Sequence, residues 1–189
     1  RTYTDEWAAV HNPYADTSKG QKEFDWFHFG KDSTMSTGWY TETNGDTYYL
    51  SPISDGTQGH MLTGWNWIDD NGDGIYEYYY FETESNGTRG KLYKNTNVGG
   101  YMVNGKGQYV DGNGRVVTKT AAEVAAAMRA ASVPSYVIQN GSWQKDAQGR
   151  WTFATTHQFK NEWAAVYNPY ADAAKGQRAY DWFYFGADG

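Results

Sequence analysis

The 189-residue chain contains no cysteine, so disulfide bonds, thiolate metal ligands and a thiol nucleophile are excluded. Leucine and isoleucine are scarce, and only four residues are proline. No apolar run approaches the roughly 20 residues of a membrane-spanning helix. The formal net charge of −6 gives the chain no attraction to nucleic acid or to an anionic membrane surface. We therefore expect no nucleic-acid partner and no membrane insertion.

Aromatic residues and glycine are abundant instead. Aromatic side chains make up 18% of the sequence, with 9 Trp and 17 Tyr, and there are 22 glycines. This composition is typical of many short strands and turns rather than of long packed helices.

A short motif occurs twice: residues 35–39 read Met-Ser-Thr-Gly-Trp, and residues 61–65 read Met-Leu-Thr-Gly-Trp. Aromatic runs at 26–29 and 48–50 precede the two motifs, and a third run at 78–81 follows the second motif. The unit is Gly-Trp, a polar turn, an aromatic strand, a Gly-rich turn and a Met. Its recurrence indicates a repeat array.

A longer duplication links the two ends of the chain. Residues 6–30 and 162–186 are identical at 18 of 25 positions. Each copy holds an Asn-Pro turn start, within loops 11–23 and 167–179 that exceed a minimal repeat. In each copy the aromatic run alternates with a period of two, which places the Phe side chains on one face. We expect these residues to fill the core: Phe27, Phe29, Phe183 and Phe185.

A lone two-stranded hairpin is barely stable in water, so such hairpins need to stack on their neighbours in the chain. The predicted fold is mainly β: a solenoid of stacked β-hairpins in two segments joined by a short α-helical linker. The first hairpin units are placed at 5–35, 36–61, 62–92 and 93–117, the last being a degenerate unit without Trp.

The linker is predicted from the capping pattern at 120–123, which starts a helix over 121–131 that ends near Pro134. Val124, Met128 and Ala131 would form its apolar stripe, and the helix is a spacer or a docking helix. The predicted domains are hairpin repeats at 1–117, a linker at 118–139 and a second, truncated set of repeats at 140–189. The pattern begins and ends within a unit, so we expect a piece of a longer protein.

The Met-x-Thr-Gly-Trp motif with its aromatic run and Gly turn resembles the choline-binding, or cell-wall-binding, repeat family of Gram-positive surface proteins. Related repeats occur in glucan-binding and clostridial toxin proteins. The resemblance covers most of the chain outside residues 118–135, and it is most specific at 24–92. It implies a β-hairpin solenoid that holds an extracellular protein on the cell envelope.

The resemblance also implies aromatic cages between consecutive hairpins. One cage would combine Trp7 and Trp26 with Tyr49 and Met35. A second would contain Trp65 and Tyr78, with Tyr109 as the nearest third ring. Trp163 and Trp182 match the pair in the second set, where Tyr184 could close a cage with Trp143. Trp39 and Tyr80 lack a third ring, because Thr47 stands where an indole is expected, and His28 replaces a usual Tyr.

Aromatic faces attract a quaternary ammonium group at roughly 0.5–2 kcal/mol per contact. The same rings could stack on sugar faces, or they could simply fill the space between hairpins, and the sequence leaves these alternatives open. Repetition along the stack would convert weak sites into firm attachment.

Other motifs point away from metal binding and catalysis. Residues 69–77 resemble the start of a calcium loop, but position twelve is Tyr80 instead of a bidentate Glu, so a hairpin turn is the better interpretation. The four histidines show no metal-ligand spacing. Neither a nucleophile elbow nor a P-loop nor an HExxH motif is present, and no carboxylate pair stands out. We expect no catalytic residues, no metal and no cofactor.

The sequence thus predicts a non-catalytic module that attaches a secreted, cell-surface protein to the cell wall. Its partner would be a cell-wall polymer, either teichoic-acid choline or a polysaccharide. Two alternatives stay open. The chain could be the binding part of a cell-wall hydrolase whose catalytic domain lies elsewhere, or a structural module that self-associates, with a homodimer as its simplest form.

Overall fold

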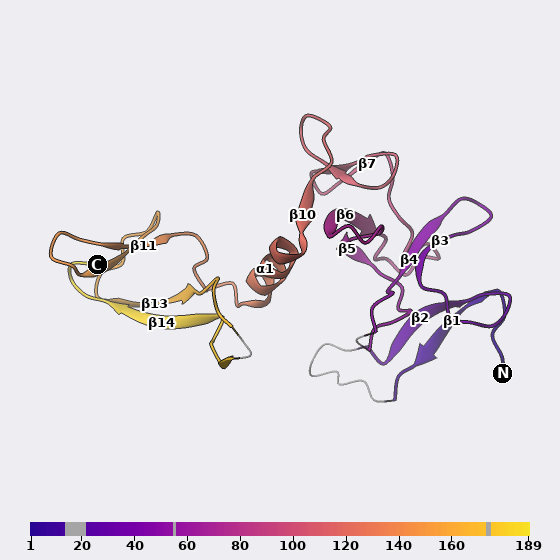
Figure 1. Ribbon diagram of the computed structural model, residues 1–189, viewed down its shortest axis with the longest axis horizontal. Coiled ribbons are helices and arrows are strands. Elements are labelled where there is room, and N and C mark those ends of the chain that lie inside the picture. The colour runs from indigo at the N-terminus through magenta and orange to yellow at the C-terminus, as the bar shows by residue number, and fades with distance from the viewer. Residues whose placement is uncertain (14–21, 55, 173–174) are drawn as a thin grey trace. The chain divides into compact units, whose positions relative to one another are not determined.

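The computed structural model describes residues 1–13, 22–54, 56–172 and 175–189 (Figure 1). The described chain is mainly β, with strands paired into hairpins and one helix. It divides into two compact units, Arg1–Thr120 and Ala121–Gly189. The predicted inserted loops at 11–23 and 167–179 fall partly outside the described residues. Across the described ranges, no helix has the length and apolar character that a membrane crossing demands.

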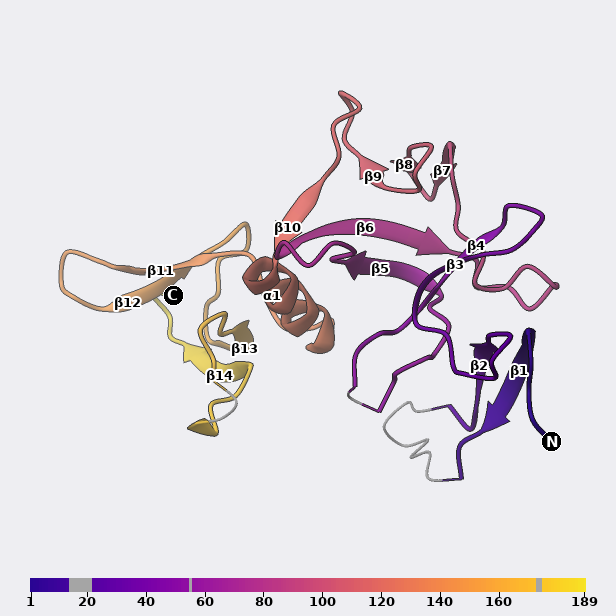
Figure 2. The ribbon, with the colours of Figure 1, turned by 45° about the vertical axis from the view of Figure 1, so that its right-hand side comes forward.

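The first unit is built from antiparallel hairpins at the predicted places. β1 (Glu6–His11) pairs with β2 (Phe24–Phe29), β3 (Gly38–Thr41) with β4 (Thr47–Leu50), and β5 (Gly64–Ile68) with β6 (Ile75–Phe81). The degenerate fourth unit is a three-stranded meander of β7 (Thr96–Val98), β8 (Tyr101–Val103) and β9 (Tyr109–Val110). β10 (Thr118–Thr120) returns to pair with β6, a long-range contact that the sequence did not indicate (Figure 2).

The calcium-like sequence forms the turn between β5 and β6. Both carboxylate oxygens of Asp69 accept backbone hydrogen bonds, from Gly72 N at 2.8 Å and from Gly74 N at 2.9 Å. Asp73 in turn accepts a hydrogen bond from the Ile75 amide at 2.8 Å. These carboxylates satisfy the backbone of the turn, in agreement with the hairpin-turn interpretation.

The core of the first unit lies between neighbouring hairpins. Tyr49 of β4 packs with Ile68 of β5 and with Tyr79 and Phe81 of β6, and Phe81 is completely buried. Trp39 of β3 lies against this cluster, with its ring edge to face with Tyr79 at 5.1 Å between centroids. Each hairpin therefore buries its rings against the next one, which is how hairpins too weak to stand alone are stabilised.

The junctions between hairpins repeat the same contacts. Isolated bridges join Leu50 to Met61 and Phe81 to Leu92, so each aromatic strand ends against the residue that starts the next motif. The Met61 amide donates to the carbonyl of Trp26 at 3.0 Å, and the Leu92 amide donates to the carbonyl of Thr47 at 2.8 Å. Trp26 and Thr47 therefore occupy equivalent places in successive hairpins.

A glycine under each junction residue explains the Gly-rich turns. The Met35 side chain lies over Gly59, and the Met61 side chain lies over Gly90. A Cβ on either glycine would collide with the methionine sulfur, and both glycines have positive φ, +82° and +84°. The methionine of each junction thus packs on the glycine of the following turn, where a side chain would collide with it.

The second unit contains α1 (Ala121–Ser132) and two hairpins, β11 (Ser142–Lys145) with β12 (Trp151–Ala154) and β13 (Glu162–Tyr167) with β14 (Tyr180–Phe185). The helix predicted over 121–131 is confirmed, but its predicted apolar stripe is wrong. Val124 is buried, whereas Met128 is 67% exposed and Ala131 is exposed as well. A helix composed mostly of alanine has little apolar surface to bury, so one valine makes its packing contact.

The hairpins of the second unit share a core of their own. Phe153, Phe159, Val166 and Phe185 are buried together, with Ile138 packed against them. Phe185 therefore fills the core as predicted. Phe183 differs, since it is 38% exposed, and in the first unit Phe27 and Phe29 are half-buried. The expected core face is real but incompletely covered.

Candidate functional site

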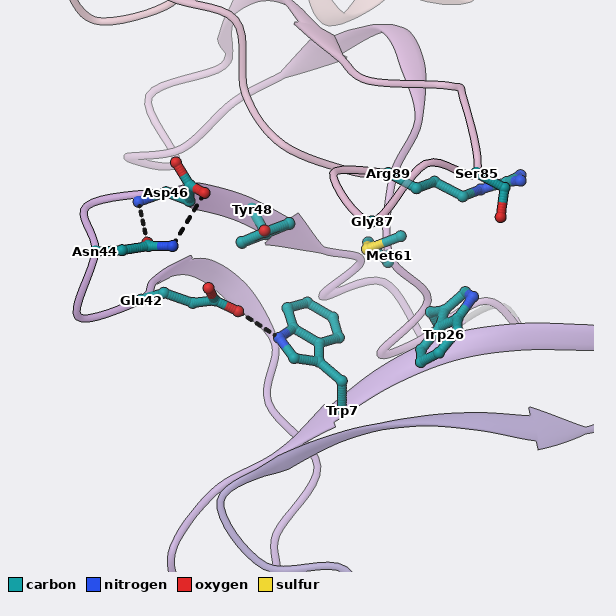
Figure 3. Close-up of a pocket in the computed structure, with 10 residues that line it drawn as sticks. All are labelled: Trp7, Trp26, Glu42, Asn44, Asp46, Tyr48, Met61, Ser85, Gly87 and Arg89. Carbon is teal, nitrogen blue, oxygen red and sulfur yellow. Dashed lines mark hydrogen bonds between the residues drawn. The ribbon is translucent and has the colours of Figure 1, made fainter.

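A cavity of about 300 Å³ lies where the first two hairpins meet the following turns (Figure 3). Aromatic and sulfur-containing side chains form one part of the wall, and charged and small polar residues form the rest. The lining residues are Trp7, Trp26, Glu42, Asn44, Asp46, Tyr48, Met61, Ser85, Gly87 and Arg89. Trp7 comes from β1, Trp26 from β2 and Tyr48 from β4, so the site exists only when the hairpins stack.

Specific contacts fix the orientation of Trp7. Its indole Nε1 donates a 2.8 Å hydrogen bond to Oε1 of Glu42 (Figure 3). Its ring meets the ring of Tyr48 edge to face at 5.0 Å between centroids, and the ring of Tyr40 in the same way at 5.8 Å. Because two rings and one hydrogen bond hold it, the indole is preorganised as a wall of the cavity.

The charges at the aromatic end favour a cation. Glu42 is half-buried, and one of its carboxylate oxygens accepts a hydrogen bond from a neutral indole N–H. No cationic partner cancels the negative charge of Glu42 at that oxygen. Asp46, by contrast, is paired with Lys91 at 2.7 Å. Burial, with a smaller contribution from Glu42, raises the pKa of Tyr48 to about 12, so its ring stays neutral. Neutral π faces beside a carboxylate attract a desolvated cation.

His28 lies behind this wall. It is 3% exposed, stacks on Tyr40 at 3.8 Å between ring centroids, and places Nδ1 2.8 Å from the Ser36 hydroxyl oxygen. Burial lowers the pKa of His28, and Asp5 and Glu42 partly oppose that shift. His28 is therefore neutral, and its buried ring supports the indole of Trp7 by direct contact.

The predicted first cage needs two replacements. Both tyrosines are buried, at 7% and 6% exposure, but Tyr48 lines the cavity, whereas Tyr49 lies on the opposite face of β4 and packs in the core cluster. A register error of one residue exchanges the two faces of a strand, which explains this difference. Met61 lines the cavity in place of Met35, because the Met61 amide is the one that donates to the carbonyl of Trp26.

The predicted second cluster is assembled, but its rings contact one another. Trp65 stacks on Tyr78 at 4.6 Å between centroids, and Tyr78 stacks on Trp67 at 4.3 Å. Tyr109 approaches Trp65 edge-on at 6.2 Å between centroids. The Lys119 ammonium nitrogen lies 5.3 Å from the centroid of Trp67. These rings leave no room for a guest between Trp65 and Tyr78, and a cation of the chain itself covers the end of the stack.

Trp39 and Tyr80 do not form a cage. Trp39 packs into the core beside Tyr49, and the ring of Tyr80 meets Tyr93 at 5.1 Å. Thr47 occupies the place equivalent to Trp26, and its hydroxyl accepts a 3.0 Å hydrogen bond from Lys94 Nζ. A threonine bonded to a lysine thus stands where the first junction has an indole.

In the second unit the predicted residues lie on two different faces. Register places Trp163 opposite Tyr184 and Ala165 opposite Trp182, and the three rings are 64%, 55% and 54% exposed in the order Trp163, Tyr184 and Trp182. Trp143 instead contacts Phe183, at 4.8 Å between centroids, on the core side of the sheet. The expected cage of Tyr184 with Trp143 is therefore wrong, since alternation sends them to opposite faces. Tyr136 stacks on Trp182 instead, at 5.8 Å.

Of the ten lining residues, the sequence predicted Trp7 and Trp26 and missed the other eight. Two of these carried a usable signal, because Met61 begins the second motif and Tyr48 stands in the aromatic run of β4. The other six lie outside the strands, where the period-two pattern says nothing of side-chain direction: Glu42, Asn44, Asp46, Ser85, Gly87 and Arg89. His60, one of the four histidines without metal-ligand spacing, places Nδ1 3.2 Å from Oδ2 of Asp25 and meets Phe27 edge to face. This pair ties the turn at 57–61 to β2.

Comparison with known proteins gives matches among solved structures alone: no family model and no curated protein sequence matches the chain. Choline binding protein F of Streptococcus pneumoniae, crystallised with a peptidoglycan analogue, matches 46% of this chain at 31% identity, with a TM-score of 0.36. The choline binding domain of Spr1274 from the same organism matches 48% at 33% identity, with a TM-score of 0.34. CbpJ, also from S. pneumoniae, matches 54% at 28% identity, with a TM-score of 0.34.

The matches differ in how much of the other protein they cover. The chain spans 24% of the length of choline binding protein F and 33% of CbpJ, but 90% of the Spr1274 domain.

Proposed function

The chain belongs to the choline-binding repeat family, by its 33% identity over 90% of a choline binding domain and its repeated Met-x-Thr-Gly-Trp motif, and on that premise we propose that it is a non-catalytic module whose cavity at Trp7, Trp26 and Tyr48 binds a quaternary ammonium group. The hairpins continue as a solenoid, and the module attaches a longer, secreted protein to choline-bearing polymer of the cell wall.

One observation carries the choice of ligand: the carboxylate of Glu42 adjoins an aromatic cavity. Its hydrogen bond to Trp7 holds a negative charge beside the rings. A sugar would stack on the same rings without needing that charge, whereas a cation gains from both. At roughly 0.5–2 kcal/mol per ring, three rings give a weak site of about millimolar affinity, and attachment then depends on several such sites along one polymer.

The arrangement also accounts for a binding role without catalysis. Both acidic residues that line the cavity are engaged, Glu42 by the indole N–H of Trp7 and Asp46 by Lys91. The activity of the whole protein is a separate matter, because the chain spans 24% of choline binding protein F, a much longer relative.

Titration of the full chain with choline, followed by tryptophan fluorescence, tests the proposal. The neutral carbon isostere 3,3-dimethylbutan-1-ol serves as the control ligand, and a glucan oligosaccharide represents the sugar alternative. We expect saturable binding of choline and at least about tenfold weaker binding of the isostere, because the isostere lacks the charge.

Trp26→Thr is the informative variant, because threonine already occupies the equivalent place at Thr47. It should weaken choline binding about tenfold, while Trp151→Thr, the same change at a 59% exposed indole of the second unit, leaves it unchanged. Equal binding of choline and its isostere, or tighter binding of the glucan, would reject the cation site.

A further inference from the structure

We infer that the second unit contains a binding site of its own, which takes a pyranose sugar chain in the cavity between its two hairpins. The cavity has a volume of about 490 Å³, and small-molecule sites usually measure about 300–1,000 Å³. Its lining includes three rings and three hydrogen-bonding side chains: Trp143, Tyr170, Phe183, Gln139, Asn168 and Asp181. All of them belong to the second unit, so the inference goes beyond the proposed function and does not depend on it.

The cavity is not a second copy of the proposed cation site. Asp181 and Phe183 lie on one face of β14 and Trp182 lies on the other, because side chains alternate along a strand. Trp182 is the residue equivalent to Trp26 in the duplicated segments, and it does not line this cavity. Trp143 of the other hairpin contributes its ring instead, 4.8 Å from that of Phe183 between centroids.

The carboxylate of Asp181 is available to a ligand. Its equivalent in the first copy, Asp25, lies with Oδ2 3.2 Å from Nδ1 of His60. In the second copy, over the residues that the structure describes, Asp181 has neither an ion pair nor a hydrogen bond from a side chain. The protein itself therefore occupies the first acid and leaves the second one to accept hydrogen bonds from a bound molecule.

Two side-chain amides add a donor and a further acceptor. Oδ1 of Asn168 accepts a 3.0 Å hydrogen bond from the Tyr170 amide, which leaves Nδ2 as a donor. Nε2 of Gln139 donates to the Ala130 carbonyl at 2.9 Å, which leaves Oε1 as an acceptor. A sugar hydroxyl both donates and accepts, so it can pair with the carboxylate and with either amide.

These free amides distinguish the cavity from the proposed cation site. There, Asn44 is engaged at both ends, since Nδ2 donates to Oδ2 of Asp46 at 3.1 Å and Oδ1 accepts from the Asp46 amide at 2.8 Å (Figure 3). A quaternary ammonium group cannot accept a hydrogen bond, so a free amide donor adds nothing to its binding. Rings beside unengaged donors and acceptors therefore favour a polyhydroxyl ligand.

The loop between β13 and β14 holds a ring ready beside the cavity. Within this loop the Asp172 amide donates to Oε1 of Gln177 at 2.9 Å, and Lys175 Nζ lies 3.1 Å from Oδ2 of Asp172. Tyr170, in contrast, is 89% exposed although it lines the cavity. An exposed ring on an anchored loop can stack on a sugar face with little loss of conformational freedom.

Nuclear magnetic resonance of the full chain tests the inference through the indole N–H signal of Trp143, assigned with Trp143→Phe. The chain is titrated first with choline, and then, with choline kept in excess, with chitotetraose and with mannotetraose. We expect choline to leave the Trp143 signal in place and at least one tetrasaccharide to shift it saturably. The excess of choline keeps the sugars from the cavity at Trp26.

Two variants should each weaken sugar binding about tenfold: Tyr170→Ala, which removes a ring, and Asp181→Asn, which removes the charged acceptor. Tyr184→Ala makes the first change at an exposed ring on the other face of β14, and Asp188→Asn makes the second at an exposed acid outside the cavity. Both controls should bind the sugars as the unmodified chain does.

The outcomes separate this site from the cation site. A Trp143 signal that neither tetrasaccharide moves overturns the sugar site. A signal that choline moves, with the effect lost in Asp181→Asn, also overturns it, because the cavity would then take a cation. Equal losses in Tyr170→Ala and Tyr184→Ala would place the sugar on the other face. None of these results touches the cation site, which is judged by choline binding in Trp26→Thr.

Discussion

The indole of Trp7 on β1 and the phenol ring of Tyr48 on β4 meet edge to face, with their centroids 5.0 Å apart. Between the next two hairpins Trp39 and Tyr79 repeat this contact at 5.1 Å. In the first pair the neighbouring place holds Trp26, and a cavity remains; in the second it holds Thr47, which accepts a hydrogen bond from Lys94. The two junctions therefore differ at this place: an indole lines a cavity in the first, and a hydrogen-bonded threonine stands in the second.

The division of roles between Tyr48 and Tyr49 can be tested directly. Tyr48→Leu removes a ring from the cavity and should weaken choline binding about three- to tenfold. Tyr49→Leu removes a core ring and should lower the free energy of unfolding by about 1–3 kcal/mol while the folded protein keeps its choline affinity. Fluorescence titration and urea denaturation measure the two effects. A larger loss of affinity in Tyr49→Leu would show that the assigned register is wrong.

The packing of Met61 on Gly90 gives a second prediction. Gly90 and Gly87 both have positive φ, +84° and +92°, but only the Cβ of an alanine at 90 would strike Met61. Gly87→Ala therefore measures backbone strain alone. Gly90→Ala should cost about 1–3 kcal/mol more in urea denaturation, because the displaced side chain overpacks the junction. It should also weaken choline binding, since Met61 lines the cavity. Equal costs for the two variants would contradict the proposed packing.

The buried His28 predicts a loss of stability in acid. Its folded pKa lies below the ordinary value of 6.5, mainly because of burial, so the unfolded chain binds the proton more readily. The stabilising contribution is present above the unfolded pKa and is lost as the pH falls through the lowered pKa of the folded state. Melting temperatures between about pH 7.5 and pH 5.5 should therefore decline in the unmodified chain.

His28→Phe should make this decline shallower, because phenylalanine does not titrate, although its stability near neutral pH will be lower once Ser36 loses its partner. His11→Phe, the same change at an exposed histidine, serves as the control and should keep the slope of the unmodified chain. An unchanged slope in His28→Phe would show that other groups cause the acid sensitivity.

The hairpins could be predicted from sequence because their signals are local. Alternating rings, polar turns and glycine place each strand pair within a few residues, and the hairpin of β13 and β14 follows from its copy in β1 and β2. The pairing of β10 with β6 could not be predicted, because the paired residues, from Thr118 with Glu77 to Thr120 with Ile75, are 41 to 45 residues apart and carry no shared pattern. The domain limits at 117 and 139 stay a prediction.

The sequence by itself determined the repeat, the family and the period-two alternation, and it identified Trp7 and Trp26 as candidate cavity residues. Each of these features depends only on residues close together in the chain. Only the tertiary structure decided that Tyr48 and Met61 complete the cavity, and that Glu42 and Arg89 reach it from turns. The physical reason is that a cage between hairpins depends on how one strand faces the next and on where turns place charged side chains. The orientation of the strands and the positions of the charged side chains are fixed only when the hairpins pack, so the sequence of one strand does not determine them.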